Sequence, residues 1–149
     1  MWLIMEGIVA AENAMGRESR MDYAAVPYWT CIVPNVAGVG LTEDGAVKKG
    51  YDVKIARFFL AADGMATVLG QRTGMLKLIA ERKYGQILGV HIVGAQAMEL
   101  IADASLAVKQ ELTPGDIGAV LHAYPSLSEA LWEAARSITR DSIHLLSHS

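Results

Sequence analysis

A proline placed just before a helix start signal constrains this chain more than any other feature. Pro125 cannot lie inside a helix, and it biases Tyr124 toward an extended backbone. Ser126 and, three residues later, Glu129 have the spacing of a capping box, in which two residues close the first helical turn. Apolar residues then recur at helical spacing, at Leu127, Ala130, Leu131, Ala134 and Ile138. The pattern predicts a kinked loop that leads into an amphipathic helix over residues 127–139.

The remaining patterns predict strands and helices in an order typical of one fold class. β-Branched and aromatic residues bounded by turn residues predict strands at 26–39, 51–60, 75–82 and 86–93, the last two joined as a hairpin. Helical spacing with N-cap residues or closing glycines predicts helices at 1–15, 42–50, 97–111 and 114–121. Residues 61–72 are expected to form a loop with one helical turn. Because most strands precede the long helices, we expect an α+β fold, an antiparallel sheet packed with helices.

The composition limits the size and the partners of the protein. The chain of 149 residues has room for one domain with a sizeable core, but not for two complete domains. Hydrophobic residues make up 52% and charged residues 19%, which indicates either apolar surface hidden against another subunit or domain, or an alanine-rich core. The net charge is -3, and basic residues occur only in short pairs such as Lys48-Lys49. A nucleic-acid partner is therefore not expected.

The start of the chain and its cysteine content bear on location. The apolar stretch 1–5 has no basic flank and is interrupted by Glu6, so it predicts neither a signal peptide nor a membrane span. It reads as the end of a longer helix, followed by a polar linker that begins at Arg17. Cys31 is the only cysteine and cannot form an internal disulfide. We expect a cytoplasmic protein.

Some features suggest chemistry but favour structural roles. Residues 38–40 read Gly-Val-Gly, but no third glycine completes a dinucleotide-binding loop, so a glycine-rich turn is expected. His91 lies in an apolar strand and is expected to be packed. His144 and His148 have the spacing of a metal pair without a third ligand, so metal binding is not favoured. Cys31 has no neighbouring base or second cysteine and is expected to be an ordinary buried thiol.

The junction at Pro125 resembles the closing motif of the FAD-dependent pyridine nucleotide-disulfide oxidoreductases, most closely that of the dihydrolipoamide dehydrogenases. Their pattern is near His-x-His-Pro-Thr-x-x-Glu; His122, Pro125 and Glu129 match it, Ser126 replaces threonine, and Tyr124 replaces the second histidine. Further segments resemble the family in the same order. Glu6-Gly7 and residues 10–16 resemble the last helix of the flavin-binding domain, 22–27 and 34–43 the opening strands of the interface domain, and 74–79 and 89–94 its central hairpin.

This resemblance implies an organisation in two parts. Residues 1–21 would be a remnant helix of the FAD-binding domain with its linker, and residues 22–149 the dimerisation or interface domain. In the family this domain builds the homodimer and lends a His-Glu dyad to the flavin-disulfide site of the opposite subunit. The site residues implied here are Tyr124, Glu129 and His122 as catalytic residues, with Pro125 at the cofactor. The family's His-Pro bond is cis, so a cis Tyr124-Pro125 bond is expected.

Tyr124 departs from the family pattern at the catalytic base. A tyrosine hydroxyl ordinarily titrates near pH 10 and a histidine near 6.5, a gap of about 3.5 pKa units or about 4.8 kcal/mol. A tyrosine here is thus a poor general base but a capable hydrogen-bond donor. His122, two residues earlier, could serve as the base if the loop shifts. Mercuric reductases, a related branch, are similar in carrying tyrosine in this region, although the cysteine pair of that branch is missing here. Tyr124 could also be a half-buried aromatic residue with a purely structural role.

The family's reaction requires parts that this sequence does not contain. Oxidation of a dithiol by FAD and NAD needs a flavin site, a nicotinamide site and a redox-active cysteine pair, and their motifs are missing from the 149 residues. The parent enzyme is expected to use FAD and NAD, whereas the chain alone is expected to bind neither and to be inactive. Two alternatives remain open: a free-standing dimerisation module without catalytic duty, and a domain of a related oxidoreductase with a tyrosine-based site.

Overall fold

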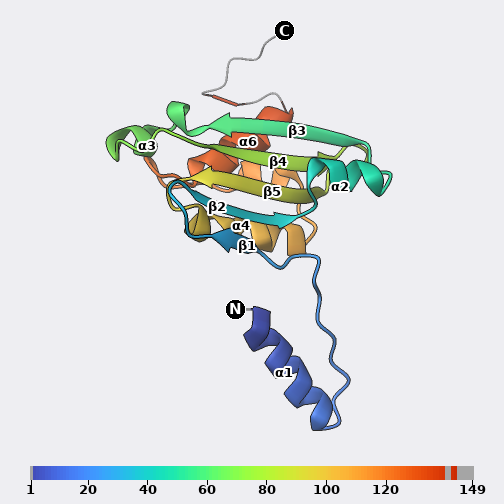
Figure 1. Ribbon diagram of the computed structural model, residues 1–149. Coiled ribbons are helices and arrows are strands. Elements are labelled where there is room, and N and C mark those ends of the chain that lie inside the picture. Colours follow the sequence, from blue (N-terminus) through green and yellow to red (C-terminus); the bar gives the residue numbers. More distant parts are fainter. Residues whose placement is uncertain (1, 140–141, 144–149) are drawn as a thin grey trace.

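A five-stranded antiparallel sheet forms the centre of the computed structural model, which describes residues 2–139, 142 and 143 (Figure 1). The strands are β1 (Tyr28–Thr30), β2 (Asn35–Gly40), β3 (Val53–Phe59), β4 (Met75–Glu81) and β5 (Ile87–Gly94). They lie in the order β1-β2-β5-β4-β3, and each neighbouring pair is antiparallel. The predicted hairpin is the β4–β5 pair at the middle of the sheet. The α+β class is confirmed.

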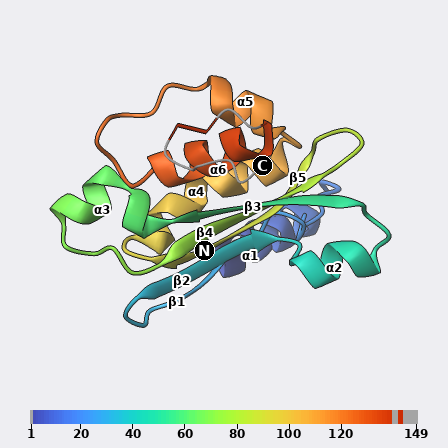
Figure 2. The same ribbon diagram turned by 90° about the horizontal axis from the view of Figure 1, so that it is seen from above.

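Helices pack on both faces of this sheet, and the two long helices of the C-terminal half lie on the same face. The elements outside the sheet are α1 (Trp2–Ala14), α2 (Glu43–Lys48), the 3-10 turn η1 (Leu60–Ala62), α3 (Gly64–Val68), α4 (Ala97–Lys109), α5 (Pro114–Ala119) and α6 (Glu129–Thr139). α4 lies along β2 and β5, and α6 lies along β3 and β4 with α5 packed against it (Figure 2). The short helix α2 packs on the opposite face, where Ala46 contacts Ile79 and Leu88.

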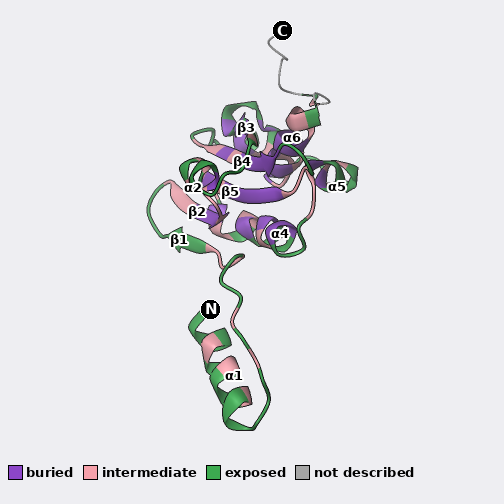
Figure 3. Ribbon diagram, turned by 90° about the vertical axis from the view of Figure 1, so that its right-hand side faces the viewer, coloured by how far each residue is buried: buried purple, intermediate pink, exposed green. Residues whose placement is uncertain are grey.

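The alternation of side chains along the strands places the main core under α4 and α6. In β4, Leu76 and Leu78 are buried, whereas the intervening Lys77 forms an ion pair with Glu43 of α2 at 3.0 Å. Phe58 of β3 is among the largest fully buried side chains. Figure 3 shows the buried residues concentrated between the sheet and these two helices. The predicted apolar stripes of the two long helices therefore form the core with one face of the sheet.

Two of the predicted helix starts have the expected caps. Thr42 caps α2, with its Oγ1 accepting a hydrogen bond from the Gly45 N–H at 3.1 Å. Thr113 and Asp116 form a complete capping box at α5, with Pro114 in the first turn. The hydrogen bonds that Thr113 donates to the Asp116 carboxylate lower the pKa of Asp116.

The first helix, α1, stands apart from the sheet domain (Figures 1 and 3). None of its residues is buried, although it is apolar on most sides, and Trp2 and Ile4 are 54% and 62% exposed. Gly16 ends this region with a φ of +82°, as predicted. A helix with this much exposed apolar surface normally packs against other protein. Among the residues that the structure describes, no helix is both long and apolar enough to cross a membrane.

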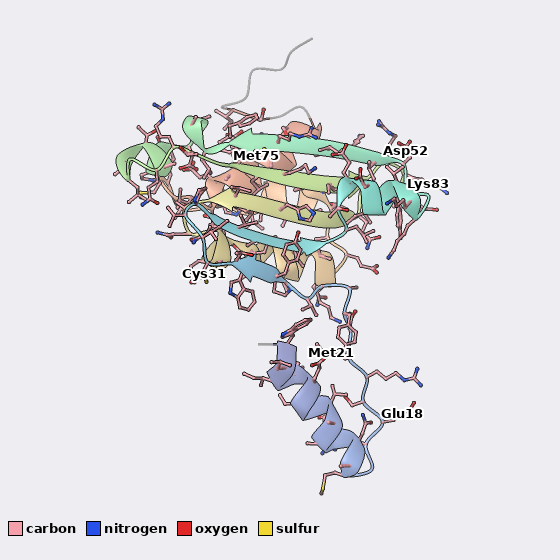
Figure 4. The ribbon with its side chains drawn as sticks, viewed as in Figure 1. Glu18, Met21, Cys31, Asp52, Met75 and Lys83 are labelled. Atoms are coloured by element: carbon pink, nitrogen blue, oxygen red, sulfur yellow. The ribbon has the colours of Figure 1, made fainter. Side chains whose placement is uncertain are left out.

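Two sequence predictions about short segments are wrong. Residues 38–40 form part of β2 rather than a turn, because Tyr28 and His91 cross over Gly38: a Cβ there would lie 2.5 Å from Tyr28 Oη and 2.7 Å from His91 Nδ1. Cys31 is exposed rather than buried, because it lies at the edge of the sheet, in the connection that follows the edge strand β1 (Figure 4). Its Sγ lies 3.6 Å from the Sδ atom of Met98.

Candidate functional site

The loop before α6 has the predicted kink but a later helix start. The Tyr124-Pro125 peptide bond is cis, as the family resemblance predicts. The Glu129 carboxylate accepts a hydrogen bond from the Ser126 N–H at 3.1 Å, one half of a capping box. The Ser126 hydroxyl instead pairs with the hydroxyl of Ser128 at 2.8 Å. α6 consequently begins at Glu129, two residues later than the sequence pattern predicts.

Tyr124 and Glu129 line one small cavity. Its volume is about 240 Å³, and its walls also include Phe58, Asp63 and Gly64 from β3 and the start of α3. Tyr124 is 77% exposed, whereas Phe58 and Asp63 are 1% and 2% exposed. The cavity therefore has a buried floor from one part of the chain and a solvent-facing phenol from another. The sequence gives no signal that connects Asp63 with Tyr124, since the two are 61 positions apart.

His122 lies in the same loop but does not line this cavity. Its Nδ1 lies 3.1 Å from the carbonyl oxygen of Val120, within its own segment of backbone. The structure thus brings together two of the three predicted catalytic side chains, Tyr124 and Glu129. The roles of all three residues, and that of Pro125 beside a cofactor, remain predictions.

Large side chains are exposed around this loop. Val120, Leu121 and Tyr124 are 55%, 95% and 77% exposed, and Pro125 is exposed as well. Exposed apolar side chains that gather into a patch typically mark a contact with another protein surface, and these four lie within six consecutive positions. The loop is thus anchored by the hydrogen bond from the Ser126 N–H to the Glu129 carboxylate, while these side chains face solvent.

A second polar cluster crosses the sheet face opposite α4 and α6. The Tyr28 hydroxyl lies 2.9 Å from His91 Nδ1, and His91 Nε2 lies 3.1 Å from the Leu41 carbonyl oxygen. Because Nε2–H must donate to that carbonyl, Nδ1 of the neutral ring accepts from Tyr28. Burial lowers the pKa of His91, the hydrogen bond to Leu41 opposes this, and the nearby charge of Lys77 adds to it. His91 is the packed, hydrogen-bonded residue that its strand pattern predicts.

The lowered pKa of His91 makes stability depend on pH. As pH falls below about 6.5, the unfolded chain binds a proton at this histidine before the folded chain does. We therefore expect stability to fall between neutral pH and the lowered folded pKa, by at most about 1.4 kcal/mol per pH unit. In H91Q this part of the loss should vanish, as urea unfolding at a series of pH values would measure. Parallel pH profiles for the two proteins would refute the assignment.

Metal binding receives no support from the part of the chain that the structure describes. No group of three or more His, Cys, Asp or Glu side chains there could hold a metal ion. The candidate pair His144 and His148 lies outside the described residues.

Comparisons with known proteins identify the family. Residues 26–135 match the dimerisation domain of the pyridine nucleotide-disulphide oxidoreductases. The dihydrolipoyl dehydrogenase of Thermus scotoductus is 44% identical over 142 residues, which cover 95% of this chain and 31% of that protein. That of Bacillus subtilis is 40% identical over 140 residues, covering 93% of this chain and 30% of that protein.

Solved structures of related proteins contain the same fold. The crystal structure of LpdA from Mycobacterium tuberculosis superposes with a TM-score of 0.83 and 27% identity, covering 90% of this chain and 29% of that one. A Cu(II) complex of the HOCl-induced flavoprotein disulfide reductase RclA from Escherichia coli superposes with a TM-score of 0.79 and 25% identity, covering 87% of this chain and 30% of that one. The chain thus spans about 30% of the length of these relatives. It belongs to the pyridine nucleotide-disulfide oxidoreductase family, as a dimerisation domain of the kind found in dihydrolipoyl dehydrogenase-like flavoproteins.

Proposed function

We propose that this chain is the interface part of a homodimeric, dihydrolipoyl dehydrogenase-like enzyme that uses FAD and NAD. The single observation that carries the proposal is the loop at Tyr124 and Pro125, which is anchored by Glu129 and offers exposed side chains outward. The 44% identity with a dihydrolipoyl dehydrogenase supports it. Further protein, comparable to the part of the relatives that this chain does not match, would provide the flavin, nicotinamide and disulfide sites.

In this proposal, each subunit presents its loop to the flavin-disulfide site of the opposite subunit. FAD held in the rest of the enzyme would supply, together with the redox-active disulfide, the two-electron chemistry for oxidation of the dithiol. Pro125 shapes the loop at the cofactor, and Glu129 fixes it by accepting the Ser126 N–H. Tyr124 places a hydroxyl group where the family has its catalytic histidine. Since Leu121 and Tyr124 are 95% and 77% exposed, the loop has surface available for such a contact.

The chemistry of this site differs from that of a histidine-bearing relative. Tyr124 brings a hydroxyl group, which would donate a hydrogen bond to a thiolate or to a leaving sulfur, in place of an imidazole that can abstract a proton. His122 would have to turn away from the Val120 carbonyl in order to act as the base. We therefore assign Tyr124 the role of donor and Glu129 that of loop anchor.

The proposal extends to the ends of the domain and to its location. Residues 1–21 would be the last helix of the flavin-binding domain with its linker, and residues 22–149 the interface domain. The apolar and unburied surface of α1 supports this division, because such a helix needs a larger body to cover it. A cytoplasmic location, inferred from the single Cys31, belongs to the same proposal.

Tyr124 favours one alternative function in particular. A related disulfide reductase that acts on an oxidised metal or on a disulfide other than lipoamide could use a tyrosine in this place. The similar structure of RclA, described as a disulfide reductase in complex with Cu(II), supports considering this class. A free-standing dimerisation module is the other alternative.

A chimeric enzyme tests the proposal. This chain would replace the matching C-terminal third of the Thermus scotoductus dihydrolipoyl dehydrogenase, to which it is 44% identical. We expect a dimer that retains FAD and catalyses weak NAD-dependent dihydrolipoamide oxidation. A chimera that folds and binds FAD but shows turnover only with another disulfide would favour the alternative reductase. A folded chimera that turns over none of these substrates would favour the module without catalytic duty.

A further inference from the structure

Asp63 is a buried carboxylate at the start of α3 that the family motif does not include. It is 2% exposed, and its Oδ1 accepts a hydrogen bond from the Ala66 N–H at 2.8 Å. Its backbone carbonyl accepts from both the N–H and the hydroxyl of Thr67, each at 3.1 Å. Asp63 is therefore the N-cap that determines where this five-residue helix begins.

The first turn of α3 lies directly beneath the loop of Tyr124. A Cβ placed on Gly64 would be 3.7 Å from the Cβ of Pro125, an ordinary packing distance. Asp63, Gly64, Tyr124 and Glu129 together line the cavity of about 240 Å³. The loop is thus supported on two sides, by Glu129 from α6 and by the capped turn of α3.

We propose that Asp63 is a positioning residue for Tyr124: it fixes the first turn of α3, and this turn supports Pro125 and sets the position of the phenol at the cavity. The catalytic use of Tyr124 rests on the proposed function, whereas the support of its loop by Asp63 does not. Tyr124 is 77% exposed and so has few contacts of its own to hold it. Its position must come from the backbone to which it is attached and from what that backbone rests on.

Three variants separate positioning from a general loss of stability. D63A removes the cap, whereas D63N keeps a side-chain oxygen at the cap position, because asparagine caps helices about as well as aspartate. T42A removes the same kind of cap from α2, on the other face of the sheet, because the Thr42 hydroxyl accepts a hydrogen bond from the Gly45 N–H. It is the matched control for losing one helix cap away from the cavity.

The readout is fluorine NMR of the chain labelled with 3-fluorotyrosine. The chain has five tyrosines, so five resonances are expected, and that of Tyr124 is assigned from Y124F. Tyr84, which is 75% exposed in the β4–β5 turn, is an internal reference with nearly the same exposure as Tyr124. The NMR test needs no flavin, so its result is independent of the chimeric enzyme. The positioning role of Asp63 can fail while the chimera is active, and it can hold while the chimera is inactive.

In D63A we expect the Tyr124 resonance to move toward the position of free fluorotyrosine while that of Tyr84 stays. In D63N the Tyr124 resonance should return to its original position, and in T42A it should never leave it. An unmoved Tyr124 resonance in folded D63A would overturn the proposal. So would equal movement of Tyr124 and Tyr84, or a Tyr124 shift in T42A of the same size as in D63A.

Discussion

Y124H is expected to raise the rate of dihydrolipoamide oxidation by the chimeric enzyme about 10² to 10⁴-fold, the usual contribution of a well-placed general base. The loop already has another matching feature, the Glu129 carboxylate that anchors it. A histidine with its ordinary pKa near 6.5 is largely unprotonated at pH 7.5 and can take a proton from a thiol, whereas a phenol cannot. Steady-state kinetics of the two chimeras would measure the gain.

Y124F is the matched control, because it keeps the ring and removes only the hydroxyl group. If Tyr124 donates a hydrogen bond in the reaction, Y124F should be slower than the chimera with tyrosine. In addition, H122A should leave the rate of the tyrosine form nearly unchanged, since the His122 ring contacts the Val120 carbonyl and does not line the cavity. Equal rates for Tyr124, Y124H and Y124F would mean that this side chain takes no part in the chemistry.

G89A is expected to destabilise the domain by about 3 kcal/mol, the upper end of the usual cost of overpacking. A Cβ on Gly89 would lie 2.1 Å from the carbonyl oxygen of Leu41. Backbone cannot swing aside as a side chain can, and the Leu41 N–H is bonded to the Leu88 carbonyl at 2.8 Å. The chain would have to break this pairing next to β5. Urea unfolding followed by tryptophan fluorescence would measure the loss.

G115A is the control for the same chemical change at an open position. A Cβ there meets only the Thr113 hydroxyl at 3.5 Å, an ordinary contact, and the residue lies in the first turn of α5. Alanine is favoured over glycine in helices by up to about 1 kcal/mol, so G115A should be neutral or slightly more stable. A stability of G89A equal to that of G115A would show that β5 and the Leu41 segment can separate without cost.

Local patterns were enough to predict most elements of this fold, although the stretch 26–39 contains two separate strands, β1 and β2. The β4–β5 hairpin, the caps at Thr42 and Thr113 and the buried stripe of α4 each depend on residues close together in the chain, so the sequence pattern contains the whole cause. The cis bond before Pro125 followed from the family resemblance rather than from any local pattern. The start of α6 was misplaced because two serine hydroxyls bond to each other, an outcome that the capping-box pattern does not decide.

Contacts between distant segments could not be predicted in this way. The pattern around Gly38 predicts a turn, but a glycine is needed there because Tyr28 and His91 cross above it. That crossing depends on the register of three strands. The floor of the cavity could not be predicted either, because Asp63 and Tyr124 line the same cavity only through the packing of α3 on the loop. His122 lies two residues before Tyr124 in the motif, but its ring contacts the Val120 carbonyl and does not line the cavity, a difference that sequence spacing does not determine.

The solution mass of the chain across a dilution series tests the central claim most directly. A dimerisation domain should carry the contacts that join two subunits, so light scattering is expected to give twice the chain mass of 16.0 kDa down to low micromolar concentration, without bound FAD. A mass of 16.0 kDa at every concentration would contradict the account, because the chain would then lack a self-sufficient dimer interface.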